Sequence, residues 1–197
     1  MAAVVENLRE DHRNISRLLD ALDHQIGVFS KVGDPDYDII RGISEYFLDY
    51  PDACHHPKED VIFTRIKERH VKEAETLVDL LAEHRTLHEQ TARFHYTVSA
   101  LLNDTDIARS TIVDATREFI EAERRHMQKE EAHFFSLAER VLTPADWSHI
   151  EGMLTKRRDP LLGERVEERF KNLRERLLSW EREYRAGEGR LDGETSN

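Results

Sequence analysis

Apolar residues recur at alternating steps of three and four along four stretches of the chain, a spacing that places them on one face of an α-helix. The stretches are residues 4–30, 36–69, about 71–102 and 112–141. Turn sequences rich in Gly, Pro, Asn and Asp follow the first and the third stretch, at residues 33–35 and 103–106. The pattern therefore predicts an all-α fold, an up-down-up-down four-helix bundle with short connections.

Three of these stripes contain polar residues where core residues belong. The first stripe is Val5, Leu8, His12, Ile15, Leu19, Leu22, Ile26 and Phe29. The third is Leu77, Leu81, His84, His88, Thr91, His95, Val98 and Leu102, and the fourth is Ile112, Thr116, Phe119, Glu123, His126, Glu130, Phe134, Leu137 and Val141. Charged side chains are seldom fully buried unless they are paired or bound to a metal. One such histidine alone is explained most simply by a hydrogen-bonded neighbour, so its meaning depends on the other helices.

The second stretch changes phase in its middle. Its first half carries Ile40, Ile43, Phe47 and Tyr50, and its second half carries His55, Glu59, Ile62 and Ile66. The stripe slips by one residue between Pro51 and Pro57. Because proline inside a helix removes a hydrogen bond and kinks the helix, we expect one bent helix or two abutting helices here.

The polar positions form one candidate metal site. Side chains four residues apart on a helix lie on the same face, one turn apart. Seven buried polar residues without partners would each cost several kcal/mol, and a metal centre in the bundle core removes that cost. Five imidazoles and two carboxylates are too many for one tetrahedral zinc and suit two transition-metal ions, with iron favoured over magnesium or calcium. The candidate ligands are His12, His55, Glu59, His84, His88, His126 and Glu130.

With these signatures in order on four helices, residues 4–141 resemble the hemerythrin-like (HHE) family, whose fold is a four-helix bundle around a non-haem di-iron centre. The resemblance implies two non-haem iron ions as the cofactor. The ligands that it implies are His84, His88 and His126 on one iron, His12 and His55 on the other, and Glu59 and Glu130 as bridges.

The same resemblance implies a position for dioxygen or a similar small ligand, in sensing, storage or transport. The alternatives are a di-iron enzyme acting on peroxide or nitric oxide, an iron-centre repair protein, and a helical interaction protein whose histidines are incidental. His126-xxx-Glu130 matches many bacterial relatives and differs from the His-xxxx-Asp of invertebrate oxygen carriers. Two further choices stay open: His56 or Glu131 in place of an assigned ligand, and Glu123 as an acceptor for a ligand histidine or as a surface ion pair.

Composition limits the partners. The chain of 197 residues has 35% charged residues, a net charge of −11 and no block of Lys or Arg, which argues against nucleic acid and anionic membranes. No apolar run approaches the ~18 residues of a transmembrane helix. The single cysteine, Cys54, suits a reducing compartment, and no signal-peptide pattern begins the chain. We therefore expect a cytoplasmic protein.

The C-terminal third lies outside the resemblance. Thr143 and Pro144 begin a short helix, and a second helix over 163–186 carries a narrow apolar seam. The seam is Val166, Phe170, Leu173, Leu177, Trp180 and Tyr184. It predicts a clasp on the bundle or a homodimer, with the dimer favoured because twofold pairs are the commonest assembly. The expected domains are a bundle over 1–142, a helical extension over 143–186 and a disordered tail over 187–197.

Overall fold

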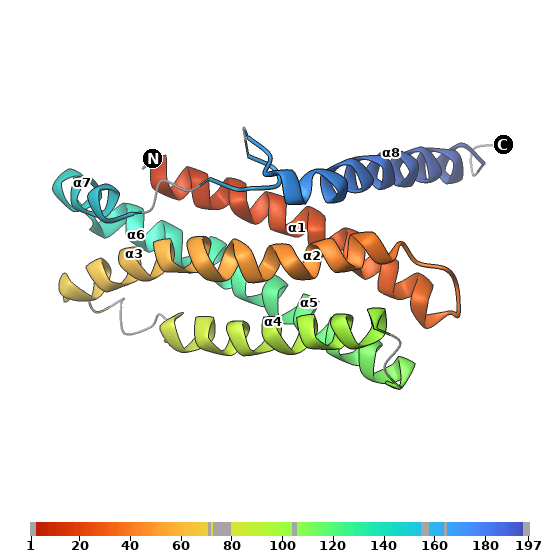
Figure 1. Ribbon diagram of the computed structural model, residues 1–197. Coiled ribbons are helices and arrows are strands. Elements are labelled where there is room, and N and C mark those ends of the chain that lie inside the picture. Colours follow the sequence, from red (N-terminus) through yellow and green to blue (C-terminus); the bar gives the residue numbers. More distant parts are fainter. Residues whose placement is uncertain are drawn as a thin grey trace.

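The computed structural model describes residues 3–70, 72, 80–103, 106–154, 158–163 and 165–194. Within these ranges all regular secondary structure is helical, as the stripes predicted (Figure 1). The α-helices are α1 (Ala3–Ser30), α2 (Tyr37–Asp49), α3 (His56–Glu68), α4 (Leu80–Leu102), α5 (Arg109–Lys129), α6 (Phe135–Val141), α7 (Pro144–Met153) and α8 (Lys171–Glu194). Two π-helical turns, η1 (Pro51–His55) and η3 (Glu130–Phe134), and a short 3₁₀ turn, η4 (Glu168–Phe170), complete the set.

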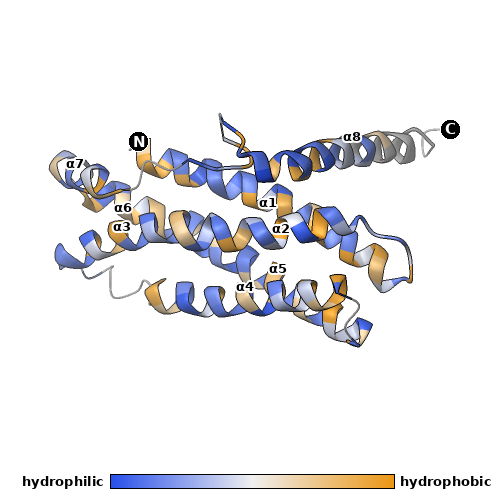
Figure 2. Ribbon diagram, in the orientation of Figure 1, coloured by the Kyte–Doolittle hydropathy of each residue, from blue (hydrophilic) through white to orange (hydrophobic). Residues whose placement is uncertain are grey.

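The helices pack as a bundle around two main apolar cores. Helix α1 lies against α5 and α2, and α4 lies against the same two helices (Figure 1). In Figure 2, apolar and polar residues alternate along each of these helices, as expected for amphipathic helices. Along α1, Leu8 belongs to one core and Ile15 to the other, with His12 between them. Along the α5–η3 segment, Phe119 belongs to the core that contains Ile15, and Phe134 belongs to the core that contains Leu8. A polar layer therefore separates the two apolar cores.

Both π-helical turns lie at this polar layer. The backbone N–H of His55 donates to the carbonyl of Tyr50, five residues back, at 3.2 Å. A π-helical turn contains one residue more than an α-helical turn, so it moves the inward face by one position. The slip of the stripe between Pro51 and Pro57 is therefore accommodated within a nearly continuous α2–η1–α3 segment. The second turn begins at Glu130, and π-turns of this kind occur often at functional sites.

Helix α4 presents a different face from the one that the third stripe predicted. Its buried residues include Leu80, His84, Leu87, Thr91, Phe94 and Val98. The predicted stripe and the observed one share His84, Thr91 and Val98, but Leu87 and Phe94 point inward where His88 and His95 were expected. The predicted start of this helix, with Leu77, lies outside the described residues.

The C-terminal seam packs on its own bundle. Helix α8 lies along α1 and α2 (Figure 1), and Phe170, Leu173 and Leu177 are buried in the same core as residues of those helices. Further along the seam, Trp180 is partly buried and Tyr184 is 45% exposed. The seam therefore forms a clasp on its own bundle. Its buried residues, which the sequence suggested for a homodimer contact, are covered by α1 and α2. Among the described helices, none has both the length and the hydropathy that a membrane span requires.

Asp146 fixes α7 to α3, and its loss should destabilise the bundle. Its side chain is fully buried, completes a capping box with Thr143, and pairs with Arg65 at 2.7 Å and with Arg69. These hydrogen bonds outweigh the effect of burial and hold the pKa of the Asp146 carboxyl well below its usual range. Removing one partner of such a network costs about 2–4 kcal/mol, so Asp146→Ala should lower Tm by roughly 10 °C in thermal unfolding.

The exposed Glu151 on the same helix provides the control for that measurement. Glu151→Ala removes an acid of α7 without touching the network, and its Tm should stay within about 2 °C of the parent. Equal Tm values for the two variants would show that the Asp146 network contributes nothing to stability.

Candidate metal centre

Seven polar side chains meet in the layer between the two cores. They come from the four helical segments α1, α2–η1–α3, α4 and α5–η3, and each is at most 7% exposed. The residues are His12 of α1, His55 of η1, His56 and Glu59 of α3, His84 of α4, His126 of α5 and Glu130 of η3. Six of them are sequence candidates, and His56 is the one that was left as an alternative.

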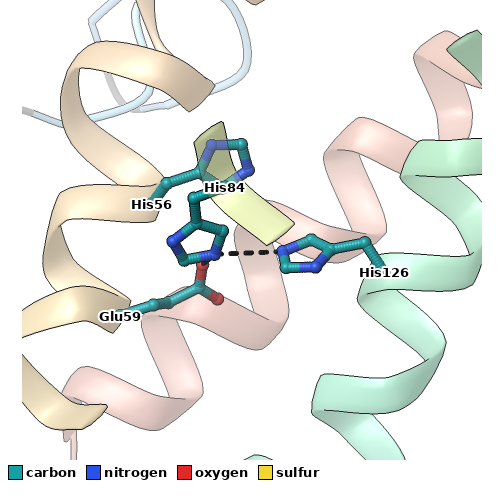
Figure 3. A group of neighbouring side chains, drawn as sticks. All are labelled: His56, Glu59, His84 and His126. Atoms are coloured by element: carbon teal, nitrogen blue, oxygen red, sulfur yellow. Dashed lines mark hydrogen bonds and ion pairs between the residues drawn. The ribbon is translucent and has the colours of Figure 1, made fainter. Parts of the chain in front are cut away.

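The histidines form two groups that share Glu59. One group joins His56, Glu59, His84 and His126, which Figure 3 shows converging from three helices. The other joins His12, His55 and Glu59. Within each group one nitrogen or oxygen atom per residue lies within 4.8 Å of all the others. The Nε2 atoms of His84 and His126 are 3.1 Å apart, about the separation of two neighbouring nitrogens bound to one metal at ~2.1 Å.

The two buried glutamates each face both groups. Glu59 directs Oε1 toward His55 at 3.3 Å and Oε2 toward His84 at 3.6 Å. Glu130 directs Oε2 toward Nε2 of His12 and Oε1 toward Nε2 of His126, both at 3.3 Å. A carboxylate whose two oxygens face two different sets of nitrogens has the arrangement of a bridging ligand between two metal ions.

A carboxylate from a neighbouring helical segment holds the outer nitrogen of four of the histidines. Each of these acids is adjacent in sequence to another member of the site, so the pairs link the bundle segments in a closed ring. The Nδ1 pairs are His55 with Asp11 at 3.1 Å, His84 with Asp60 at 2.6 Å, His126 with Glu83 at 3.2 Å, and His12 with Glu131 at 3.0 Å. An acceptor at Nδ1 favours the tautomer whose Nε2 lone pair is available to a metal.

The polar atoms at the centre lack hydrogen-bond partners. Both oxygens of Glu59, both oxygens of Glu130 and Nε2 of His12 are buried and unsatisfied. Each orphaned atom of this kind costs about 1–3 kcal/mol, and buried native groups are otherwise nearly always paired. These atoms converge with the imidazole nitrogens, so the donor set fits a pair of cations.

The neighbouring charges within the site favour charged forms of several side chains despite burial. Burial acts to lower the pKa of His84, but its bonds to Asp60 and Glu130 outweigh burial and raise the pKa to about 10. The same competition, with Glu59 and Asp11 as the raising groups, brings the pKa of His55 to about 9. The acids around His55 and His84 therefore favour positive charge at these two positions.

The carboxylates respond in the opposite sense. Burial and the charge of Glu130 act to raise the pKa of Glu59, but His55 and His12 lower it to about 2.

His56 differs from the other histidines of the site. Burial lowers the pKa of His56 to about 4, so this imidazole is neutral near pH 7 and one of its ring nitrogens carries no proton.

Two sequence candidates have other positions than expected. His88 lies outside both groups, with its side chain 65% exposed and Nδ1 bonded to Asp52 at 3.0 Å. The reason is the α4 face described above, on which Leu87 takes the inward position. Glu123 is neither a surface ion pair nor an acceptor for His126, since Glu83 has that place; it is 1% exposed and its Oε1 has no partner.

Together, the fold and the site define an all-helical protein with a buried histidine–carboxylate cluster that could hold metal cations. The sequence model of the hemerythrin HHE cation-binding domain matches residues 3–138. The chain belongs to this family. No curated protein and no solved structure showed a significant match.

Proposed function

We propose that this chain holds two non-haem iron ions and binds dioxygen or a related small ligand, for sensing, storage or transport. The observation that supports it most directly is the pair of buried glutamates, each with one oxygen toward each histidine group. A single cation would leave half of these oxygens unsatisfied, whereas two cations use all four. The cation-binding family and the unpaired atoms at the centre point the same way.

The proposed ligand set differs from the sequence expectation at one residue, because His56 replaces His88. His12 and His55 would hold one ion, and His56, His84 and His126 the other, with Glu59 and Glu130 as bridges. We also infer that the main helical segments follow the up-down-up-down order of the family.

Each group of residues has a defined task in this proposal. An imidazole-rich donor set with few carboxylates suits iron better than magnesium or calcium. When bound, iron would supply reversible redox chemistry toward a small ligand. The acids at Nδ1 hold the imidazoles in one orientation and raise their basicity toward a cation. The cores on both sides of the site, with Phe134 and Phe119, keep bulk water away from it.

A di-iron enzyme acting on peroxide or nitric oxide is the second candidate, and Glu123 favours it. This carboxyl is buried one turn before His126, and burial raises its pKa to about 7. A carboxyl that is partly protonated near neutral pH can deliver a proton to a reacting ligand, which a reversible carrier does not need.

Metal analysis tests the proposal first. Protein purified from iron-replete cells should contain about two irons per chain and show visible absorption bands that disappear when a chelator removes the metal. Absence of metal after anaerobic incubation with Fe²⁺ would contradict the proposal. Titration of the loaded protein with dioxygen and with peroxide then separates the two candidates, since a binding protein takes up no more than stoichiometric ligand and an enzyme consumes many equivalents.

A further inference from the structure

His88 occupies an unusual place next to the candidate metal centre. It is one helical turn from His84, yet its imidazole is 65% exposed while that of His84 is 7% exposed. Its Nδ1 lies 3.0 Å from Oδ2 of Asp52, a residue of the π-helical turn η1. An exposed histidine and a mostly buried aspartate thus meet beside the group that contains His56 and His84.

Asp52 connects this surface pair to the buried cluster. Its side chain is only 7% exposed, and its other oxygen, Oδ1, lies 3.5 Å from Nδ1 of His56. The ring of His56 in turn stacks on that of His84, with centroids 4.5 Å apart and planes at 17° (Figure 3). Cation-binding atoms therefore follow one another without interruption from solvent to the interior.

His88 is poorly placed to be a permanent ligand in this arrangement. Leu87 takes the inward position of α4 and is 4% exposed, so bringing His88 inside would require rotation of the helix against the apolar core. A solvated imidazole with one carboxylate offers two donors, fewer than the four that stable sites provide. Such a pair would hold a cation weakly and release it.

We propose that His88 and Asp52 form an outer capture site for a divalent cation, from which the cation passes to His56 and the buried cluster. This inference rests on the proposed function, because it needs a buried site to be filled. It assigns His88 to the rate of metal uptake and not to the bound state. The carboxylate of Asp52 moves the cation between the two imidazoles, since its oxygens face one each.

The experiment follows uptake of Fe²⁺ by metal-free protein in anaerobic stopped-flow mixing, together with the final iron content and the rate of iron loss to a chelator. His88→Ala should slow uptake about tenfold, at the low end of the gain that local capture gives to association rates. Its final iron content and rate of iron loss should equal those of the parent. Asp52→Asn should slow uptake by a similar factor.

Two further variants keep the result unambiguous. His24→Ala removes another exposed histidine, on α1, and should load at the parent rate. His88→Gln retains a hydrogen-bond donor to Asp52 but binds cations poorly, so it should be as slow as His88→Ala. Recovery of the parent rate in His88→Gln would make His88 a structural link and overturn the inference.

The remaining outcomes are also distinct. Unchanged uptake in His88→Ala overturns the inference while leaving the proposed function intact. Lower iron content or faster iron loss in that variant would show that His88 is a permanent ligand, which again overturns the inference but supports a metal centre. Failure of the parent itself to take up iron would reject the proposed function and the inference together.

Discussion

Glu59→Ala is expected to reduce the iron content from about two ions per chain to fewer than one after anaerobic reconstitution. Glu59 is the only residue that belongs to both of the histidine groups found in the described part of the chain. In the proposed centre, its removal would take one donor from each ion and would leave the repulsion between the two cations less screened. Metal analysis of the desalted protein measures the loss.

The control for this variant is Glu68→Ala on the same helix. The Glu68 side chain is 56% exposed and pairs with Arg65, so its loss should leave iron content unchanged. Far-UV circular dichroism of both variants without metal checks that the helices remain. Full iron content in Glu59→Ala would mean that Glu59 is not a bridge and would remove the main support for a two-ion site.

The apolar stripes predicted the buried face correctly for helices whose sequence offers only one apolar face. All eight members of the α1 stripe are buried, and so are the members of the fourth stripe from Ile112 to Leu137. Leucine and isoleucine at these positions determine which face turns inward, and the polar members are carried with them. The inward positions of His12, His126 and Glu130 could therefore be predicted from the sequence alone.

The third stripe failed because two repeats overlap on α4. Starting from His84, steps of four and three select His88 and His95, whereas steps of three and four select Leu87 and Phe94. Burial of Leu87 and Phe94 costs less free energy than burial of two imidazoles, so the apolar pair faces the core. The four-residue spacing of His84 and His88 is typical of metal ligands, but it does not determine which face of α4 is buried.

The choice between His55 and His56 could not be made from sequence either. Both are buried, because the π-helical turn brings consecutive residues toward the polar layer. Pro51 and Pro57 predicted an interruption of the α-helix, but they did not predict that it takes the form of a π-helical turn. In a regular α-helix two adjacent side chains point about 100° apart, so the number of candidate ligands depends on a backbone detail that periodicity does not encode.

The helical stripes do not predict the acids that face Nδ1 of the histidines, although the sequence contains a signal for them. Asp11, Asp60, Glu83 and Glu131 each stand next to a predicted ligand in the chain. Adjacent residues on a helix point about 100° apart, so each acid turns away from the centre and toward a neighbouring helix. Which neighbour it meets depends on helix packing, and only the three-dimensional arrangement shows the closed ring.

Metal-free protein should lose stability between pH 7 and pH 10, and metal-loaded protein should not. The folded-state pKa values of His55 and His84, about 9 and about 10, exceed their ordinary value. Their protonation therefore stabilises the folded state fully below pH ~6.5, and this contribution disappears as pH rises through their folded-state values. By linkage the two shifts bound this loss at roughly 8 kcal/mol, and we expect at least about 2–4 kcal/mol of it between pH 7 and pH 10, or roughly 10 °C in Tm.

Comparison of the metal-free and metal-loaded forms should reveal this effect, because cations bound at the proposed site would replace the same protons. Neutral imidazoles bind metal better, so the loaded protein gains affinity over this pH range and the Tm gap between the two forms should widen. His56 contributes the opposite sign, since its pKa is lowered to about 4, but its stabilising effect is complete above pH ~6.5 and does not change in this window. His84→Gln should flatten the metal-free curve. A metal-free Tm that stays constant from pH 7 to pH 10 in the parent would show that protons do not stand in for cations at this site.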